Sequence, residues 1–345
     1  MDLLIMNHDD ISARYENGNF VVTDKKKLPL YLSRTQNIER WLEIRAIDEH
    51  RPNSRLLKKA LRLTEKDDIS TAIRVNAATI TDSYWVKTPG STLTYADIRF
   101  DNDYFSNLAL RGDYNSFNRT MNSDKDKTPE LTNTGSFEKC WKLQNGEWWM
   151  YKKANQHEMF SELFAYELGI SLDFHMAEYR RGMHYIKTKD FTNHASVNFE
   201  PAYSFMDDND DYIDTLKILD TLAPHIIPDY IKMIFLDTLI ANPDRHTFNF
   251  GILRDKKGAI LSLSPNFDNN MALIARGYPH STTRKNDALA RLFNVALSQN
   301  EDFLTFLPTI SENMIWQVLK KLNMKVRSQF IVDFIMNGYK QIKRV

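Results

Sequence analysis

The sequence lacks the features that would identify several classes of protein. Its 345 residues contain one cysteine, Cys140, which excludes an internal disulfide and a cysteine-based metal site. The apolar run Ile231–Ala241 is too short to cross a bilayer and is interrupted by Lys232 and Asp237. The first residues lack the basic and apolar segments of a signal peptide. We therefore expect a cytoplasmic protein that does not bind membranes.

The sequence also has no net charge. Lys+Arg and Asp+Glu both number 45, so no overall basic field favours nucleic acid, and direct nucleic-acid binding is not expected. Hydrophobic residues make up 42% of the chain and charged residues 26%, which is typical of globular proteins. The length suffices for two or three domains with a sizeable core.

The N-terminal third predicts a mixed α/β region. We expect strands at Asp2–Met6 and Asn19–Val22 and amphipathic helices at Asn37–Ile47 and Asn53–Leu63. The second helix has a basic outer face, which favours a solvated surface over a docking site for a partner protein or DNA. The polar stretch Asn115–Thr134 has the composition of a connector, so a domain boundary is expected there.

A compact β-rich unit follows, and the rest of the chain is mostly helical. Asn145-Gly146 is a strong hairpin signal, and Gly169 is expected to end the helix that comes next. The order is strand, strand, helix, strand, strand: Gly135–Leu143, Glu147–Lys153, Gln156–Leu168, Ala177–Arg181 and Met183–Lys187. The later helix candidates are Asp211–Leu222, Asp229–Ile240, Asp287–Ala296, Glu301–Leu307, Asn313–Leu322 and Ser328–Gln341.

Three polar residues suggest a site for metal and base chemistry. Asp244 and Asn249 lie five residues apart, and Asp268 follows a predicted hairpin of Asn249–Arg254 and Ala259–Leu263. A hairpin returns the chain to where it left, so Asp268 should lie beside Asn249. Magnesium prefers few protein oxygens together with phosphate oxygens. Asn and Asp are ordinary loop residues taken singly, but together these three indicate phosphoryl transfer.

The β-rich unit supplies a candidate phosphate contact. Lys152 ends a strand, and Glu158 and Glu162 lie one turn apart on the following helix, so a Lys–Glu pair could hold the ammonium toward nucleotide phosphates. Lys153 is the alternative, because strand side chains alternate between faces. The loop around Gly135 could place backbone N–H groups over phosphates, or it could be a plain turn.

These motifs resemble the HipA-like serine/threonine kinases, whose fold is related to protein and phosphoinositide kinases. The resemblance rests on Asn242-Pro243-Asp244-Arg245-His246 with Asn249, on Phe267-Asp268, and on the upstream loop, strand lysine and Glu-led helix. It covers residues 130–275 clearly and the C-terminal helices loosely. It implies an α+β, bilobal kinase-like fold. Its parts would be an antiparallel-sheet N-lobe with one helix at 131–191, a helical C-lobe at 192–345, and an N-terminal α/β extension of unknown role at 1–130.

The resemblance implies an ATP- and Mg-dependent enzyme that phosphorylates Ser or Thr of a protein substrate. Asp244 would be the catalytic base, Asn249 and Asp268 would hold Mg, and His246 would line the site or serve the structure. Lys152 would contact the phosphates, with Glu158 as its ion-pair partner. The other implied nucleotide contacts are Thr134, Gly135, Ser136, Phe137, Glu138, Lys139, Arg245 and Phe267, with Lys189, Asp190 and Phe191 as a hinge that reads adenine through backbone hydrogen bonds.

The sequence departs from the family pattern at the metal aspartate. Asp268-Asn269-Asn270 has no glycine, so a flip of this loop is not expected, and the phosphate loop has one glycine. Thr132 or Thr134 would be an autophosphorylation site under this resemblance. Two other functions stay open. One is a nucleotide-binding regulatory module, such as a pseudokinase or a partner of a DNA-binding protein. The other is a phosphoinositide or small-molecule kinase, which the lack of a basic amphipathic membrane-binding segment disfavours.

Overall fold

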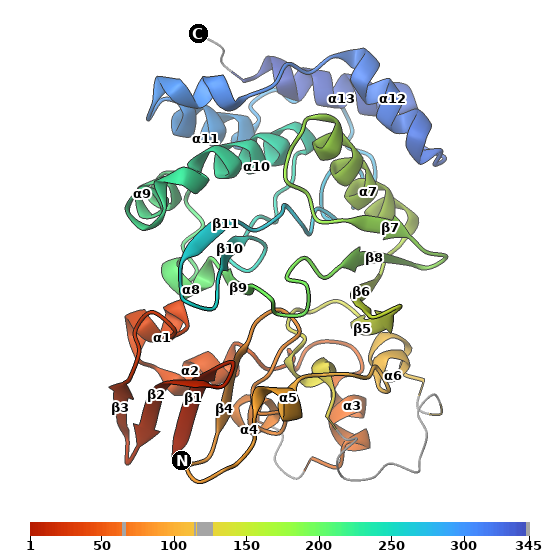
Figure 1. Ribbon diagram of the computed structural model, residues 1–345. Helices are drawn as coiled ribbons and strands as arrows, with labels where there is room; N and C mark the ends of the chain where they lie inside the picture. Colours follow the sequence, from red (N-terminus) through yellow and green to blue (C-terminus); the bar gives the residue numbers. More distant parts are fainter. Residues whose placement is uncertain (64–66, 114, 116–126, 343–345) are drawn as a thin grey trace. The chain divides into compact units, whose positions relative to one another are not determined.

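The computed structural model describes residues 1–63, 67–113, 115 and 127–342 (Figure 1). Most of the expected connector, residues 116–126, lies outside the described residues. The chain divides into two compact units. The first comprises Met1–Lys153, Tyr185–Glu200 and Leu253–Leu261, and the second comprises Ala154–His184, Pro201–Ile252 and Ser262–Val345. Within the described residues, no helix combines the length and apolarity that a membrane crossing requires.

The first unit contains a four-stranded antiparallel sheet with the order β3-β2-β1-β4. The strands are β1 (Leu3–Asn7), β2 (Asp10–Glu16), β3 (Asn19–Val22) and β4 (Tyr84–Lys87). All five residues of β1 are buried, as expected for an inner strand with apolar side chains on both faces. Sequence analysis predicted β1 and β3 but not β2, although Ile11, Ala13 and Tyr15 alternate with polar residues as a half-buried strand should.

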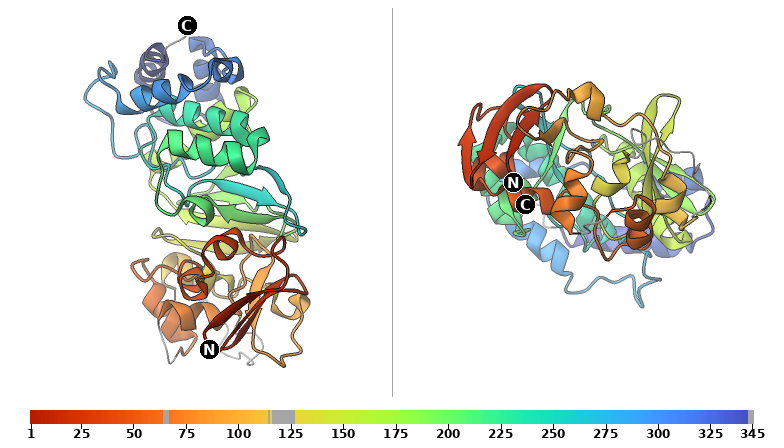
Figure 2. Two further views of the ribbon diagram at one scale, coloured as in Figure 1. Left: turned by 90° about the vertical axis from the view of Figure 1, so that its left-hand side faces the viewer. Right: turned by 90° about the horizontal axis from the view of Figure 1, so that it is seen from below.

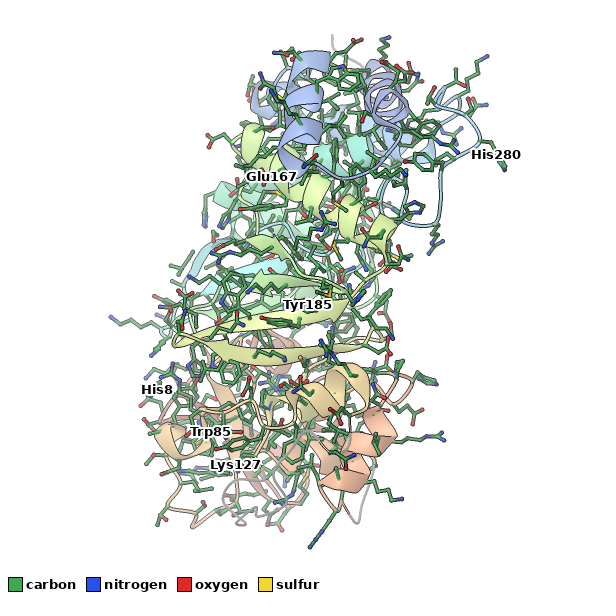
Figure 3. All side chains as sticks on the ribbon, turned by 90° about the vertical axis from the view of Figure 1, so that its right-hand side faces the viewer. His8, Trp85, Lys127, Glu167, Tyr185 and His280 are labelled. Carbon is green, nitrogen blue, oxygen red and sulfur yellow. The ribbon has the colours of Figure 1, made fainter. Side chains whose placement is uncertain are left out.

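Short helices complete this N-terminal region: α1 (Leu30–Thr35), α2 (Ile38–Glu43), α3 (Ser54–Ala60), α4 (Asp68–Ile73), α5 (Tyr95–Ile98), α6 (Ser106–Arg111) and the 3-10 helix η2 (Pro129–Thr132). The basic face predicted for α3 is partly buried, because Lys58 is only 4% exposed and its ammonium lies 3.7 Å from Asp68. Leu57 and Trp85 belong to the same apolar core, in which Trp85 is fully buried (Figure 3).

A second antiparallel arrangement in this unit pairs β5 (Lys139–Gln144), β6 (Glu147–Lys153) and β8 (Tyr185–Lys189). The Asn145-Gly146 hairpin is confirmed, and both residues have the positive φ that a two-residue turn requires, 51° and 81°. The first strand was predicted from Gly135 but begins at Lys139, so the preceding residues form a loop. Cys140, the next residue, is buried, and burial raises the pKa of its thiol.

The second unit is mostly helical and centres on α10 (Figures 1 and 2). Its helices are α7 (Gln156–Ser171), α8 (Tyr203–Met206), α9 (Tyr212–Leu222), η3 (Pro224–Ile226), α10 (Ile227–Ile240), α11 (Ala288–Leu297), η4 (Glu301–Phe306), α12 (Glu312–Leu322) and α13 (Ser328–Lys340). The order of the sheet that contains β5, β6 and β8 is β5-β6-β8-β7, where β7 is Tyr179–Arg181. A third sheet has the order β11-β10-β9 and consists of β9 (Asn198–Pro201), β10 (Gly251–Arg254) and β11 (Ile260–Leu263). Helices α7, α9, α11 and α13 pack against α10, which explains why ten of its residues are buried.

The predicted end of α7 at Gly169 is wrong, because the helix continues to Ser171. A side chain at position 169 would bring its Cβ within 2.3 Å of Sδ of Met176. Glycine is therefore required here for the close approach of another segment rather than for stopping the helix.

Gly338 in α13 faces the side chain of Arg284. A Cβ at position 338 would lie 1.9 Å from Nη1 and 2.6 Å from Cζ of Arg284. The guanidinium is held in place by three neighbours. Nη1 donates to Leu239 O at 2.6 Å, Nη2 donates to Thr238 O at 2.6 Å, and Nε donates to Asp287 at 2.6 Å.

We expect Gly338→Ala to lower the free energy of unfolding by about 1–3 kcal/mol through this overlap. In an unobstructed helix the same change would raise stability by about 1 kcal/mol. In an Arg284→Ala background the penalty should therefore disappear. Urea unfolding of the wild type, both single variants and the double variant measures the effect, and an equal penalty in both backgrounds would contradict the steric explanation.

Candidate active site

A buried ion pair in the second unit organises the loops that carry the predicted site residues. Asp237 projects from the apolar helix α10, and Arg245 follows that helix by five residues. Nε and Nη2 of Arg245 donate to the two carboxylate oxygens of Asp237 at 2.8 and 2.9 Å, and both residues are almost fully buried. Burial alone would lower the pKa of Arg245, but the Asp237 carboxylate outweighs it and raises the pKa.

The guanidinium of Arg245 joins two loops that lie far apart in the sequence. Nη1 donates to Asn249 O at 2.6 Å and to Phe267 O at 2.7 Å. Nη2 also donates to the side-chain oxygens of Asn266 at 3.0 Å and Asn269 at 2.8 Å. One nitrogen thus fixes the backbone beside both predicted metal ligands, which places the segments of Asn249 and Asp268 next to each other.

Arg245 is an expected nucleotide contact, and the structure shows its guanidinium bonded to acceptors of the protein itself. Its Nε, Nη1 and Nη2 atoms all donate to acceptors inside the protein, so no N–H group remains for a phosphate or a ribose. The sequence could not distinguish a nucleotide contact from an internal hydrogen-bond donor, because several acceptors of Arg245 are backbone carbonyls.

The loop after α10 is shaped by two asparagine side chains. Nδ2 of Asn242 donates to Asp237 at 2.9 Å, while its Oδ1 accepts the N–H of Asp244 at 3.2 Å. Nδ2 of Asn249 donates to the carbonyl of Asp244 at 2.8 Å. This bond orients the Asn249 amide, so that Oδ1 is the atom available to a metal ion. Asp244 itself is partly exposed, as a residue that contacts a substrate must be.

Asp268 follows the second loop and has a left-handed backbone, with φ at +60°. Its N–H donates to the hydroxyl of Tyr179 at 3.0 Å. Burial, together with the charges of Glu162 and Asp268, raises the pKa of Tyr179 well above its usual value, so this hydroxyl stays protonated. An unusual backbone conformation of this kind commonly marks a functional position.

Asn269, the residue after Asp268, is firmly anchored. Its N–H and Nδ2 donate to Glu162 Oε1 at 2.8 and 3.3 Å, and its Oδ1 accepts from Arg245. Asn269 is fully buried. These bonds account for the lack of glycine after Asp268 and make a flip of the loop unfavourable.

The backbone of His246 bonds to Asp244 and Asn249, while its side chain bonds locally. Its side chain is exposed, and Nδ1 accepts the N–H of Phe248 at 3.2 Å. Phe248 stacks on Tyr203 with ring centroids 4.6 Å apart. The bonding of His246 is thus that of a turn residue, which was one of its two expected roles.

The predicted phosphate loop lies in the first unit. Thr134, Gly135 and Ser136 are exposed, and Gly135 has a φ of +97° that favours glycine. Phe137, Glu138 and Lys139 connect this tip to β5 and are partly buried. Thr132 is a poor candidate for phosphorylation, because its hydroxyl is buried and donates to Ala78 O at 2.5 Å.

The two strand lysines have different surroundings. The ammonium of Lys152 lies 4.5 Å from the ring centroid of Phe137, so it lies against the loop. Lys153 is exposed and pairs with Glu138 at 2.9 Å. Both lysines therefore contact the predicted phosphate loop, Lys152 at Phe137 and Lys153 at Glu138.

The two glutamates on α7 also differ. Glu158 accepts the N–H of Asn155 at 2.8 Å, while the side chain of Asn155 accepts the N–H of Glu158 at 3.0 Å, which forms a capping box at the start of the helix. Glu162 is buried and holds Asn269. Glu158 therefore has a local structural role, and Glu162 is the glutamate that bonds to the residue after Asp268.

The expected hinge is bonded within the first unit. The N–H of Asp190 donates to Trp148 O at 2.9 Å, so this amide is engaged within the protein. The buried Asp190 carboxylate accepts from Thr192 and His194, and burial raises its pKa. Lys189 pairs with Glu147 at 2.5 Å, and Phe191 packs edge-on against Phe199.

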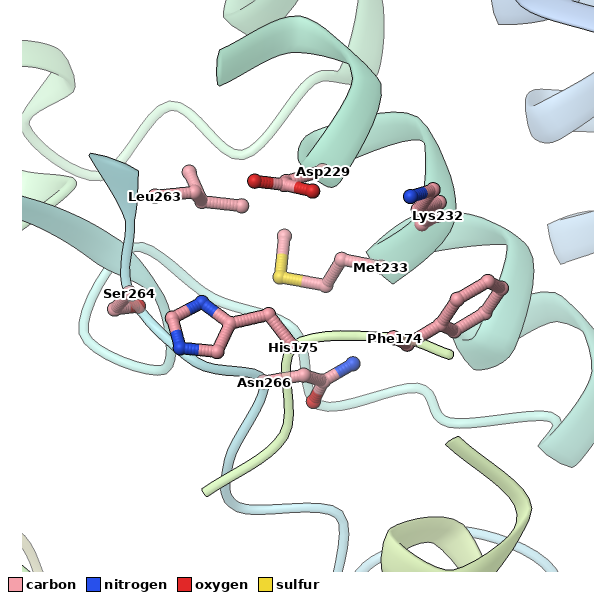
Figure 4. Close-up of a pocket in the computed structure, with 8 residues that line it drawn as sticks. All are labelled: Phe174, His175, Asp229, Lys232, Met233, Leu263, Ser264 and Asn266. Atoms are coloured by element: carbon pink, nitrogen blue, oxygen red, sulfur yellow. The ribbon is translucent and has the colours of Figure 1, made fainter. Parts of the chain in front are cut away.

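A small cavity lies in the second unit (Figure 4). Its volume of about 10 Å³ accommodates about one water molecule, so it is not a nucleotide site. It is lined by Phe174, His175, Asp229, Lys232, Met233, Leu263, Ser264 and Asn266. Among the described residues, no cluster of three His, Cys, Asp or Glu side chains forms a protein-only metal site. The pair of Asn249 and Asp268 instead suits magnesium, which keeps several ligands from phosphate and water.

Sequence analysis missed Asp237, Asn266 and Asn269 as members of this network. The sequence did contain one signal, since Asp237 is the carboxylate that interrupts the apolar run Ile231–Ala241. A charge in such a position needs a buried partner. The partner loops could not be identified, because they approach only in the folded chain.

Comparison with solved structures identifies the fold. No family model and no curated protein matches the chain. Among solved structures, a chain of the Shewanella oneidensis MR-1 HipA–HipB toxin–antitoxin complex with operator DNA matches over 98% of this chain and 97% of that one, with 12% identity and a TM-score of 0.54. The Helicobacter pylori proinflammatory kinase CtkA matches over 59% of this chain and 90% of that one, with 20% identity and a TM-score of 0.47. The chain has the HipA-like kinase fold, and the predicted α+β class is confirmed.

Proposed function

We propose that this chain, with its HipA-like kinase fold, is an ATP- and Mg-dependent kinase that phosphorylates serine or threonine residues of a protein. The observation that carries the proposal is the arrangement around Arg245, which holds the backbones of Asn249 and Phe267 on one nitrogen. These bonds bring the segments that carry Asn249 and Asp268 together, and a further bond links the Asn249 side chain to the Asp244 carbonyl.

Each residue has a role in this proposal that follows from its chemistry. Asp244 orients the substrate hydroxyl and accepts its proton. Asn249 Oδ1 and the Asp268 carboxylate hold the Mg²⁺, which when bound neutralises charge on the phosphates. Lys152 and the backbone N–H groups around Gly135 bind the phosphate oxygens. The domain roles are part of the same proposal: residues 131–191 as the nucleotide-binding lobe and residues 192–345 as the catalytic lobe.

Labelled-phosphate transfer from ATP tests the proposal. Wild-type protein is incubated with ATP, Mg²⁺ and a lysate from which small molecules have been removed. Transfer to serine or threonine of a lysate protein is the expected result. Magnesium-dependent ATP binding without transfer to any protein would instead favour a regulatory nucleotide-binding module, which the firmly anchored Asn269 also suits.

Removal of the metal should abolish transfer. With EDTA in excess we expect no labelled protein, and with Asp268→Asn we expect the Mg²⁺ concentration for half-maximal rate to rise about tenfold or more. The physical reason is the loss of one charged ligand from a site with two protein ligands. Initial rates measured across a Mg²⁺ series report the shift. Asp208→Asn, which removes an exposed carboxylate, is the matched control, and an unchanged Mg²⁺ requirement in Asp268→Asn would refute the metal assignment.

A protein partner is also part of the proposal. The solved structure that matches along nearly the whole chain contains HipB and operator DNA beside HipA. A regulatory or DNA-binding protein is therefore the kind of partner to look for with this chain.

A further inference from the structure

The predicted phosphate loop is exposed at its tip but buried at both ends. Thr134, Gly135 and Ser136 are open to solvent, whereas Asn133 and Cys140 on either side are buried. A loop with an exposed glycine has many conformations available, and a ligand that selects one of them must offset that loss of freedom. How the two ends are held therefore bears on nucleotide affinity.

One buried side chain bridges the two ends of this loop. Arg51 has a fully buried side chain and lies just before α3. Its Nη1 donates to Asn133 O at 2.8 Å, and its Nη2 donates to Lys139 O. The two nitrogens of a guanidinium are fixed in one plane, so these bonds set the separation between the start and the end of the loop.

Glu130 completes the clamp, which we define as Arg51 and Glu130. Its Oε1 accepts the N–H of Trp141 at 2.7 Å. Its Oε2 accepts Nδ2 of Asn133 at 3.1 Å and lies 3.4 Å from Nη2 of Arg51. Apart from the Arg51–Glu130 pair itself, these side-chain hydrogen bonds of the clamp reach Asn133, Lys139 and Trp141, which lie on either side of the exposed tip.

Forming the clamp has an unfavourable desolvation free energy, because folding removes the charges of Arg51 and Glu130 from water. Burial lowers the pKa of Arg51 and raises the pKa of Glu130, although each charge counteracts the shift of the other. Buried ion pairs are often no more stabilising than apolar residues of the same size. Apolar residues at these positions would thus stabilise the fold as well. A fixed separation of the two loop ends, in contrast, requires the planar guanidinium of Arg51.

We propose that Arg51 and Glu130 are positioning residues that pre-order residues 134–138 for the phosphates of a nucleoside triphosphate. This inference rests on the proposed kinase function and gives the N-terminal region a task within it. The region otherwise had no assigned role. The clamp reduces the freedom that the loop loses on binding, so its effect falls on the affinity for nucleotide rather than on the transfer step.

Kinetics of the full-length chain test the clamp. We expect Arg51→Met to raise the KM for ATP about tenfold or more, which is the effect of ordering roughly one further residue on binding. The kcat should change less than threefold. Arg51→Lys should not restore the KM, since an ammonium cannot bridge two carbonyls in a fixed plane.

The matched control is Arg254→Met. Arg254 is also a buried arginine of the first unit, paired with Glu200 and bonded to the carbonyls of Lys26 and Leu28. Its loss removes a comparable buried pair without touching the loop, so the KM for ATP should remain at the wild-type value. A KM raised equally in Arg254→Met would show general destabilisation and overturn the proposal.

Hydrogen exchange at residues 134–138 separates this inference from the proposed function. Faster exchange in Arg51→Met but not in Arg254→Met, together with the raised KM, supports the clamp. Unchanged exchange, or faster exchange with an unchanged KM, overturns the clamp and leaves the kinase function standing. Absence of ATP binding by the wild type, measured by calorimetry with Mg²⁺-ATP, would overturn both.

Discussion

Replacing Asp244 with Asn should abolish phosphate transfer while leaving the fold and ATP binding intact. The side chains differ by one atom type, and the Asp244 backbone bonds to Asn242 and Asn249 do not involve the carboxylate. The variant keeps the groups proposed to bind phosphate and metal but loses the proton acceptor. General base catalysis contributes about 10²- to 10⁴-fold, so the transfer rate should fall by that factor.

Single-turnover transfer and calorimetric ATP binding, measured on the same preparation, check this result. Asp220→Asn on the surface of α9 removes an exposed carboxylate and is the matched control. Transfer by Asp244→Asn at the wild-type rate would refute its role as base. Loss of ATP binding would instead show that Asp244 serves nucleotide binding.

Replacing Arg245 with Met should have the largest effect on stability. The substitution leaves the Asp237 carboxylate buried without its cation and removes the bonds to the carbonyls of Asn249 and Phe267. Breaking a buried ion pair by removing one partner costs about 3–5 kcal/mol. We expect a loss of that size in the free energy of unfolding, with loss of transfer activity as both loops separate.

Urea unfolding followed by tryptophan fluorescence measures the loss, and a double-mutant cycle locates its origin. Asp237→Leu combined with Arg245→Met should cost clearly less than the sum of the single substitutions, because no charge is then left unpaired. Additive costs, or a loss below about 1 kcal/mol for Arg245→Met, would contradict the central role of this pair.

The features that were predicted correctly depend on local patterns. The Asn145-Gly146 hairpin, most of the C-terminal helices and the return of the chain after Gly258 all follow from turn chemistry and apolar periodicity. The predicted hairpin of Asn249–Arg254 and Ala259–Leu263 was enough to predict that Asp268 lies near Asn249. The kinase-like fold class was also correct.

The sequence says less about residues whose contacts are distant. Arg245 resembles a ligand contact in the sequence because it follows Asp244, yet its donors serve the protein. Glu158 appears to be a partner for a lysine, although Asn155, three residues earlier, already predicts a capping box. Gly169 looks like a helix terminator until Met176 is seen against it.

The same limit applies to the clamp. Arg51 and Glu130 lie 79 positions apart, and neither residue is remarkable in its local sequence. The bonds from Arg51 to the carbonyls of Asn133 and Lys139, and those that Glu130 accepts from Asn133 and Trp141, form only in the folded chain. Periodicity and turn signals contain no information on such contacts.

The burial of Cys140 has a practical consequence for studying this protein. Because the only thiol of the chain is buried with a raised pKa, thiol-directed dyes should leave the native protein unmodified. A cysteine introduced at the exposed Ser136 would then be labelled alone, without first removing the native one. A fluorophore at that position would report loop movement in real time as nucleotide is added.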